Sequence, residues 1–300
     1  MSVESNILPT DELPPSDLDG DSAMDGAPFV LRTDNPVPVP PFWGTRCIDH
    51  IPLKALLPYI NRTTLYKFQW GFKPQGRRVD EYRAYAREHC EPILKRLVEE
   101  SESRGVLRPQ AIYGYFSCQA EGDELVIYAA PDSREELCRF PFPRQKAGRG
   151  LCIADFYRSA ESGQRDVVAL QLVTVGQSAS DFARELFVKD AYQEYLYWHG
   201  LNAEGAEALA EWVHKRIRVE LGFSREESRD LESLIKQHYR GSRYSFGYPA
   251  CPNLADQDKI LMLLDAQRIG VVLGDEDQLW PEDSTTAIVA HHPQAKYFGV

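Results

Sequence analysis

Residues 166–175 read DVVALQLVTV and give the strongest β-strand signal in the chain. Strand-like runs also occupy residues 111–117 and 125–129, separated by a hairpin-type turn at residues 121–123, and residues 137–142. Three or four strand segments in succession, with no long helix between them, favour an antiparallel sheet over a doubly wound parallel one. We therefore expect the rest of the fold to assemble around this sheet.

Helical periodicity dominates on either side of the strand block. Amphipathic spacing predicts long helices at residues 80–100, 179–199 and 203–218, the last two separated at Gly200. Strand patterns return near the end, at residues 270–273, 286–290 and 296–300. This order indicates one α+β domain, residues 31–300, whose terminal strands rejoin the sheet.

Charge is distributed unevenly along the chain. The formal net charge is −11, and no Lys or Arg precedes Arg32, whereas seven acidic residues do. This acidic, proline-containing stretch predicts a disordered leader over residues 1–30. An acidic balance disfavours nucleic-acid binding, because that function needs a basic face to displace counterions.

Several function classes lack their usual sequence signals. The six cysteines form no C-x-x-C pair, which favours free thiols in a reducing cytoplasm. No apolar run approaches the roughly 20 residues of a membrane span, so no membrane association is expected. Phosphate-binding loops, the G-x-S-x-G elbow and the H-E-x-x-H motif are missing. We expect no metal site and no self-contained catalytic constellation.

Residues 243–252 read RYSFGYPACP and combine a cation, three aromatic residues, one glycine and two prolines. They lie between helix-like segments at residues 231–239 and 256–267. Two prolines fix φ, and the glycine permits positive φ, so a stiff loop is predicted. Such a loop suits a flat, charged small molecule, but a buried aromatic turn between two helices explains the same composition.

The RYSFGYPACP motif resembles the signature of the C-terminal activation domain of cobalamin-dependent methionine synthase. Other stretches match that family in the same order. They are YGYF at residues 113–116, LCIADF at 151–156, AEALAEWVH at 206–214 and HPQAKYF at 292–298. The resemblance covers the chain from about residue 36 to its end.

This resemblance implies both a fold and a role. The family fold is a C-shaped α+β domain built on a bent antiparallel sheet. It binds S-adenosylmethionine in a shallow groove and docks over a cobalamin-binding domain of methionine synthase. A flavodoxin-type donor supplies one electron, and inactive cob(II)alamin is reductively methylated to methylcobalamin. Methionine biosynthesis then resumes.

The family's ligand-binding positions carry over residue by residue. The resemblance implies that Arg243 faces the carboxylate of S-adenosylmethionine and that Glu207 receives its α-amino group. A guanidinium can engage a carboxylate through two hydrogen bonds. Most family members have an aspartate where this chain has Asn61, after a predicted short helix at residues 52–60. Asparagine lacks the charge that partners an ammonium, so we expect weakened ligand binding.

The remaining carried-over positions concern the adenosyl side of the ligand. Ser245, Gly247 and Tyr248 occupy positions whose backbone contacts the ligand, and Tyr297 matches a tyrosine at the groove. The chain lacks the D-x-H-x-x-G stretch that supplies a cobalt ligand in this family. Cobalamin would therefore be held by a partner domain.

Two alternatives stay open at this point. The chain is either a separate polypeptide that acts in trans or a fragment of a longer protein. Its role is either that of a reactivation module or that of a non-catalytic protein. The latter would bind S-adenosylmethionine as a sensor or dock on a cobalamin domain. The first role would make it part of a methyltransferase.

Overall fold

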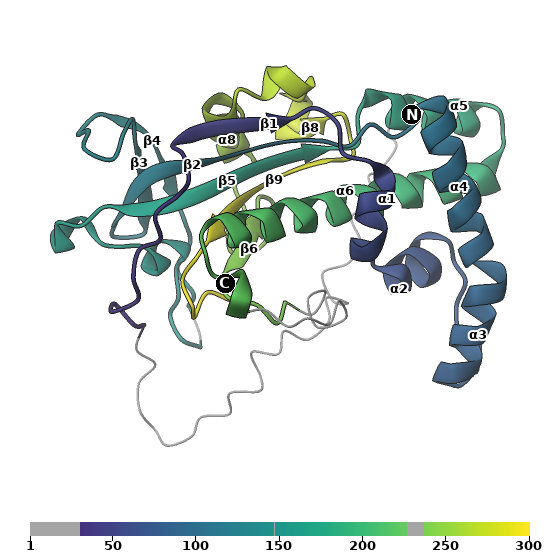
Figure 1. Cartoon of the computed structure of the whole chain (residues 1–300), viewed down its shortest axis with the longest axis horizontal. Coiled ribbons are helices and arrows are strands. Elements are labelled where there is room, and N and C mark those ends of the chain that lie inside the picture. The colour runs from purple at the N-terminus through teal and green to yellow at the C-terminus, as the bar shows by residue number, and fades with distance from the viewer. Residues whose placement is uncertain (1–30, 147, 227–236) are drawn as a thin grey trace.

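The structure is a computed structural model that describes residues 31–146, 148–226 and 237–300. The predicted leader, residues 1–30, and most of the predicted helix at residues 231–239 lie outside the described residues. The described chain forms an antiparallel sheet with helices around it (Figure 1). The predicted α+β class with an antiparallel sheet is confirmed.

The main sheet combines two consecutive hairpins, β2-β3 and β3-β4, with antiparallel pairs of strands that are distant in the sequence. Its order is β4-β3-β2-β5-β9-β6, and β1 also pairs with β2. The strands are β1 (Gly44–Ile48), β2 (Gln110–Glu121), β3 (Glu124–Tyr128), β4 (Glu136–Pro141), β5 (Asp166–Thr174), β6 (Ser242–Ser245) and β9 (Ser284–Ala290). The four strand segments predicted around residues 166–175 are β2 to β5.

Strand β2 is long enough for two strands to share one of its edges. β1 pairs with residues 111–115 and β3 with residues 117–121. Gly114 allows the close approach of β1, because a Cβ at this position would lie 2.4 Å from the carbonyl oxygen of Gly44. The other edge of β2 pairs with β5 along nine residues.

Two hydrophobic cores lie on opposite faces of the sheet. Tyr113, Val167 and Ala169 face one core, and Ile112 and Val168 face the other. Both faces are covered, so every residue of β5 is buried. This explains why its sequence is predominantly apolar instead of alternating, with its polar residues Asp166, Gln171 and Thr174 also buried.

Helices cover both faces and one end of the sheet. In Figure 1, α6 runs along one face, α8 lies on the other, and α3 to α5 gather at one end. The longer helices are α3 (Val79–His89), α4 (Glu91–Arg104), α5 (Gln177–Val188), α6 (Tyr192–Glu220) and α8 (Gln257–Leu264). Short turns complete them: α1 (Leu53–Leu56), η3 (Leu57–Tyr59), α2 (Arg62–Thr64), η4 (Leu65–Gln69), η5 (Ile153–Phe156), η6 (Ala160–Ser162), η7 (Ser224–Glu226), η8 (Leu254–Asp256), η9 (Ala266–Ile269) and η10 (Asp275–Asp277).

The predicted helix boundary at Gly200 is wrong. Gly200 lies inside the 29-residue helix α6, and the chain breaks earlier, where Asp190 adopts a φ of 56°. A Cβ at position 200 would lie 2.7 Å from the Cβ of Gln69. The glycine therefore permits close packing of α6 against η4 and does not end a helix.

Three further boundaries differ from the predictions. The helix predicted at residues 80–100 is interrupted at Cys90, because the ring of Pro92 is incompatible with the carbonyl group four residues earlier. The predicted strand at residues 296–300 is irregular chain. The predicted strand at residues 270–273 forms β7 (Val272–Leu273), which pairs with β8 (Leu279–Trp280) in a separate sheet.

No helix in the described part of the chain combines the length and apolar character that crossing a bilayer demands.

Candidate functional site

One face of α6 carries a row of polar side chains, which we call the α6 stripe. It consists of Glu204, Glu207, Glu211, His214 and Arg218, spaced three or four residues apart. Such spacing normally gives a solvated helix face. Here His214 and Arg218 are fully buried, and Glu204 is 6% exposed. The role of these buried polar side chains therefore depends on the residues that pack opposite the α6 stripe.

Strand β6 places Arg243 opposite the α6 stripe. The Arg243 Nη2 donates a hydrogen bond to Glu207 Oε2 at 3.0 Å, and the side chains are 18% and 55% exposed. The other terminal nitrogen, Arg243 Nη1, is buried and has no hydrogen-bond partner in the described structure. Arg243 and Glu207, the residues predicted to meet the two charged ends of the ligand, thus contact each other directly.

Arg243 keeps its charge in this partly enclosed position. Burial by itself lowers the pKa of the guanidinium, but Glu207 and Glu211 outweigh it and hold the pKa above its ordinary value. Arg243 is therefore a fixed cation with one nitrogen available to a ligand.

The motif at residues 243–252 is partly strand and partly turn. Tyr244 and Phe246 are 1% and 7% exposed and belong to the core, whereas Tyr248 is 46% exposed. Side chains alternate along β6, so Arg243 points away from the core that Tyr244 enters. The motif is therefore partly a buried aromatic turn and partly a surface open to a ligand: Tyr244 and Phe246 pack in the core, and Tyr248 stays accessible.

The turn after β6 is rigid. The Gly247 amide donates to the Cys251 carbonyl at 3.0 Å, and the Cys251 amide donates to the Tyr248 carbonyl at 2.9 Å. The Cys251 thiol contacts the Ser245 carbonyl at 2.8 Å. Gly247 has a φ of +88°, and a Cβ there would lie 3.0 Å from Leu254. The glycine thus serves the turn itself, and the backbone groups named here already have partners.

Tyr297 reaches this region from the C-terminal segment. Its hydroxyl group is buried and has no hydrogen-bond partner among the described residues. Burial raises the pKa of Tyr297 to about 12, and the proximity of Cys251 and Tyr248 adds to the shift. The pKa of Tyr248 is in turn raised by burial and by Glu207. Arg243, Glu207, Tyr248 and Tyr297 therefore form one site, which we call the Arg243 site.

A largely buried network of hydrogen bonds and ring contacts lies next to the Arg243 site. Glu211 accepts hydrogen bonds from Arg218 Nη2 and from the Tyr239 hydroxyl group, both at 3.2 Å. The Arg218 guanidinium lies 3.8 Å from the centre of the Tyr239 ring. His214 meets the same ring edge-on. Burial, followed by the nearby cations, lowers the pKa of His214 well below its ordinary value, so this histidine is neutral.

The sequence did not identify Arg218 and Tyr239. Arg218 lies eleven residues after Glu207, a spacing that returns to the same helix face, and this signal could have identified it. Tyr239 follows a segment outside the described residues, and only the tertiary structure brings it to α6. Lys296 fixes that approach by donating to the carbonyls of Tyr239 at 2.6 Å and Gln237 at 3.1 Å.

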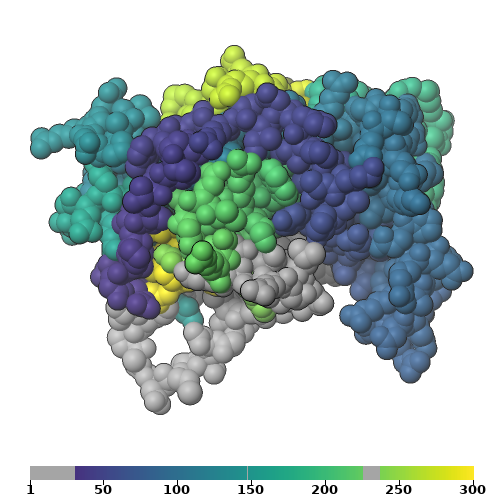
Figure 2. All heavy atoms as spheres, viewed as in Figure 1, coloured from purple at the N-terminus to yellow at the C-terminus, as the bar shows by residue number. Residues whose placement is uncertain are grey.

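Asn61 has a structural task. It is the N-cap of α2, and its Oδ1 accepts hydrogen bonds from the amides of Thr63 at 3.1 Å and Thr64 at 3.2 Å. Asparagine is among the preferred residues at this position. The N-terminal segment that carries it arches around the green part of the surface, which includes the later turns of α6 (Figure 2). No described contact joins Asn61 to Arg243.

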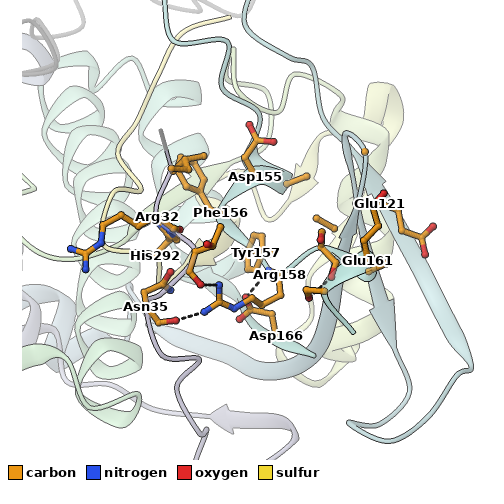
Figure 3. Close-up of a pocket in the computed structure, with 18 of the residues that line it drawn as sticks. Arg32, Asn35, Glu121, Asp155, Phe156, Tyr157, Arg158, Glu161, Asp166 and His292 are labelled. Atoms are coloured by element: carbon orange, nitrogen blue, oxygen red, sulfur yellow. Dashed lines mark hydrogen bonds between the residues drawn. The ribbon is translucent and has the colours of Figure 1, made fainter. Parts of the chain in front are cut away.

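A cavity lies elsewhere, lined in part by Leu31, Arg32, Thr33 and Asn35. It has a volume of about 700 Å³, and none of the predicted site residues lines it. Figure 3 shows Arg158 beside Asn35 in this cavity, and its guanidinium donates to the carbonyls of Thr33 and Asn35. Arg32 and Arg144, which also line the cavity, are paired with carboxylates. The terminal nitrogens of these cations are engaged within the protein, although Arg158 Nε and Asn35 Oδ1 are buried without a partner in the described structure. We assign the ligand chemistry to the Arg243 site because the predicted site residues Arg243, Glu207, Tyr248 and Tyr297 gather there and not in this cavity.

No three His, Cys, Asp or Glu side chains in residues 31–146, 148–226 and 237–300 are grouped so that they could hold a metal ion. The six cysteines are all free thiols.

Comparison with known proteins places this arrangement in a family. Residues 52–300 match the family described as vitamin B12 dependent methionine synthase, activation domain. Methionine synthase of Mycobacterium tuberculosis (strain ATCC 25618 / H37Rv) is 43% identical over 283 residues, which are 90% of this chain and 24% of the relative. Methionine synthase of Mycobacterium leprae (strain TN) is 43% identical over 281 residues, covering 89% and 23%. The chain thus spans about a quarter of the length of these curated relatives.

A solved structure shows the same fold. It is described as the MetH reactivation domain bound to AdoHcy and superimposes with a TM-score of 0.80 at 24% identity. The match covers 90% of this chain and 86% of the other. The resemblance predicted from the sequence motifs is confirmed. The chain belongs to the activation-domain family of vitamin B12-dependent methionine synthase.

Proposed function

We propose that the Arg243 site binds S-adenosylmethionine and that the domain supports reductive methylation of a cobalamin held by another domain. The observation that carries the proposal is the pair of unsatisfied buried groups, Arg243 Nη1 and the Tyr297 hydroxyl, close to the Glu207 carboxylate. Buried polar groups normally have partners, and a pair without them suits a polar ligand. The AdoHcy complex of the solved relative supports the same ligand class.

The ion pair between Arg243 and Glu207 matches the amino-acid end of this ligand. In the structure the two side chains neutralise each other at 3.0 Å. A ligand with both a carboxylate and an ammonium can replace each partner with the complementary group. Arg243 would then bind the carboxylate through two nitrogens, and Glu207 would accept hydrogen bonds from the ammonium.

The half-exposed Tyr248 offers an aromatic surface beside this ion pair. We propose that it lines the adenosyl side of the ligand together with Tyr297 and the backbone of Ser245 and Gly247. The rigid turn favours this role, because a preorganised surface loses little conformational entropy on binding. Asn61 completes the proposed set from the α2 side, with a neutral side chain.

Bound S-adenosylmethionine supplies a methyl group on a positively charged sulfur. We propose that this domain presents it to cob(II)alamin on a cobalamin-binding domain of methionine synthase, in trans or within a longer chain. One electron from a flavodoxin-type donor balances the conversion to methylcobalamin: the cobalt–carbon bond forms as the sulfur–methyl bond breaks, and the ligand leaves as S-adenosylhomocysteine. The same proposal places the protein in the cytoplasm, and its free thiols favour a reducing compartment.

Two measurements test the proposal. Titration calorimetry should show saturable binding of S-adenosylmethionine to this chain. Visible spectroscopy should then show methylcobalamin forming from a cob(II)alamin-loaded methionine synthase fragment, a one-electron donor and S-adenosylmethionine, only when this chain is present. Binding without methylation would instead support a non-catalytic sensor or docking protein. Absence of binding by the folded chain would refute the assignment of the site.

A further inference from the structure

Glu204 is a buried acidic residue outside the Arg243 site as defined above. It lies on the α6 stripe, three residues before Glu207, and is 6% exposed. No hydrogen bond to its carboxyl group is present among the residues that the structure describes. A carboxyl group in such surroundings is costly, because it loses most of its hydration and gains no hydrogen bond from a described residue.

The position of Glu204 along α6 is fixed by its neighbours. One turn earlier, Gly200 packs against Gln69 and Trp70 of the η4 region. One turn later, Glu207 meets Arg243. Glu204 therefore lies between the segment that follows Asn61 and the ion pair of the Arg243 site.

The environment of Glu204 disfavours its charged form. Burial raises its pKa to about 8, and the negative charge of Glu207 adds to the shift. The charged and titratable groups around the site are Glu207, Glu211, His214 and Arg218 from α6, Arg243 from β6, Tyr248 from the turn, and Lys296 and Tyr297 from the C-terminal segment. On the α1–α2 side, Lys54 and Arg62 are paired with Glu102 and Glu91. No described cation forms an ion pair with Glu204.

The net charge of the ligand-bound site indicates a role for Glu204. S-adenosylmethionine carries two positive charges, on sulfur and nitrogen, and one carboxylate. Together with Arg243 and Glu207, the bound ligand would leave one positive charge uncompensated in a partly dry site. Asn61 cannot compensate it, since its side chain is neutral and its oxygen already accepts two amide hydrogens. An ionised Glu204 brings the local charge to zero.

We propose that Glu204 is a second acidic ligand, with Glu207, for the ammonium end of S-adenosylmethionine, and that it loses its proton when the ligand binds. This inference rests on the proposed function of the Arg243 site. It assigns a ligand-binding role to a side chain whose burial would otherwise only lower the stability of the fold.

Calorimetry of the full 300-residue chain tests the proton as well as the affinity. Titrations with S-adenosylmethionine at pH 6.5, in two buffers with different ionisation enthalpies, give the number of protons released. At this pH Glu204 is protonated in the free protein, and the ligand amine, with an ordinary pKa of about 7.7–8.0, keeps its own proton. The wild-type chain should release close to one proton for each ligand bound.

Glu204→Gln should weaken binding about tenfold or more and abolish the proton release, because a neutral amide replaces a charged acceptor. The matched control is Glu88→Gln, which removes one exposed carboxylate on α3 and should change neither quantity. Equal affinity and equal proton release in wild type and Glu204→Gln would overturn the inference, as would a wild-type chain that binds without releasing a proton. That second outcome does not depend on how well the variant folds.

The outcomes separate this inference from the proposed function. A folded wild-type chain that does not bind S-adenosylmethionine refutes both. Binding that is lost in Arg243→Ala and unchanged in Glu204→Gln keeps the Arg243 site and removes Glu204 from it.

Discussion

Replacing Arg243 with alanine should separate ligand binding from folding. The substitution removes the guanidinium that pairs with Glu207 at 3.0 Å and whose Nη1 is buried without a partner. A charged hydrogen bond contributes about 1.5–3 kcal/mol. Loss of one such bond to the ligand carboxylate should therefore raise the Kd for S-adenosylmethionine about 10- to 150-fold.

The effect on stability should be much smaller. Glu207 is 55% exposed, so water can hydrate its carboxylate once Arg243 is gone. A partly exposed ion pair of this kind contributes about 0–1 kcal/mol. In a domain of this size, that corresponds to a fall in Tm of less than about 4 °C.

The assay pairs titration calorimetry with thermal unfolding followed by circular dichroism. Arg243→Lys keeps the charge but loses the planar two-nitrogen geometry, so its affinity should lie between those of wild type and Arg243→Ala. Arg87→Ala, at an exposed position on α3, is the matched control and should behave as wild type. A large fall in Tm with unchanged affinity would refute the reasoning and make Arg243 part of a structural turn.

Three other substitutions test separate parts of the structure. Asn61→Asp keeps the N-cap and adds a negative charge. If position 61 meets the ligand ammonium, calorimetry should show that this variant binds S-adenosylmethionine about fivefold more tightly than wild type. Equal affinities would remove Asn61 from the site. Glu204 ionises near pH 4.5 when unfolded and near 8 when folded, so its contribution to stability is lost as pH rises between these values. Glu204→Gln should therefore gain stability over wild type by about 1.4 kcal/mol per pH unit across this range in thermal melts, and a constant difference would contradict the burial argument. Glu220→Ala leaves the hydroxyl groups of Tyr113 and Tyr115, both 2.9 Å from the Glu220 carboxylate, without their acceptor. It should reduce the free energy of unfolding in urea by about 2 kcal/mol or more, and no change would show that water replaces the acceptor.

Local signals were sufficient for the central part of the sheet. Residues 166–175 are predominantly apolar, and this pattern predicts β5 because both of its faces are buried. The turn at residues 121–123 predicts the hairpin of β2 and β3 for a similarly local reason, since Gly122 adopts a positive φ. Such features depend on residues close together in the chain.

Boundaries that depend on distant neighbours were not predictable in this way. Gly200 looks like a helix break but lies inside α6, because Gln69, far away in the sequence, packs against it. Residues 243–245 look like a loop but form part of β6, since β9 supplies the hydrogen-bonding edge. Residues 296–300 have strand composition and no strand partner in the described structure.

The same division holds for the candidate site. Motifs of fixed spacing were sufficient to identify the family and, through it, Arg243 and Glu207 as candidates for the two charged ends of the ligand. The tertiary packing shows that these side chains touch, that Tyr239 and Arg218 support them, and that Glu204 is buried with no hydrogen bond from a described residue. A side chain's charge and chemistry are local properties, whereas its burial and its partners depend on which segments the sheet and α6 bring together.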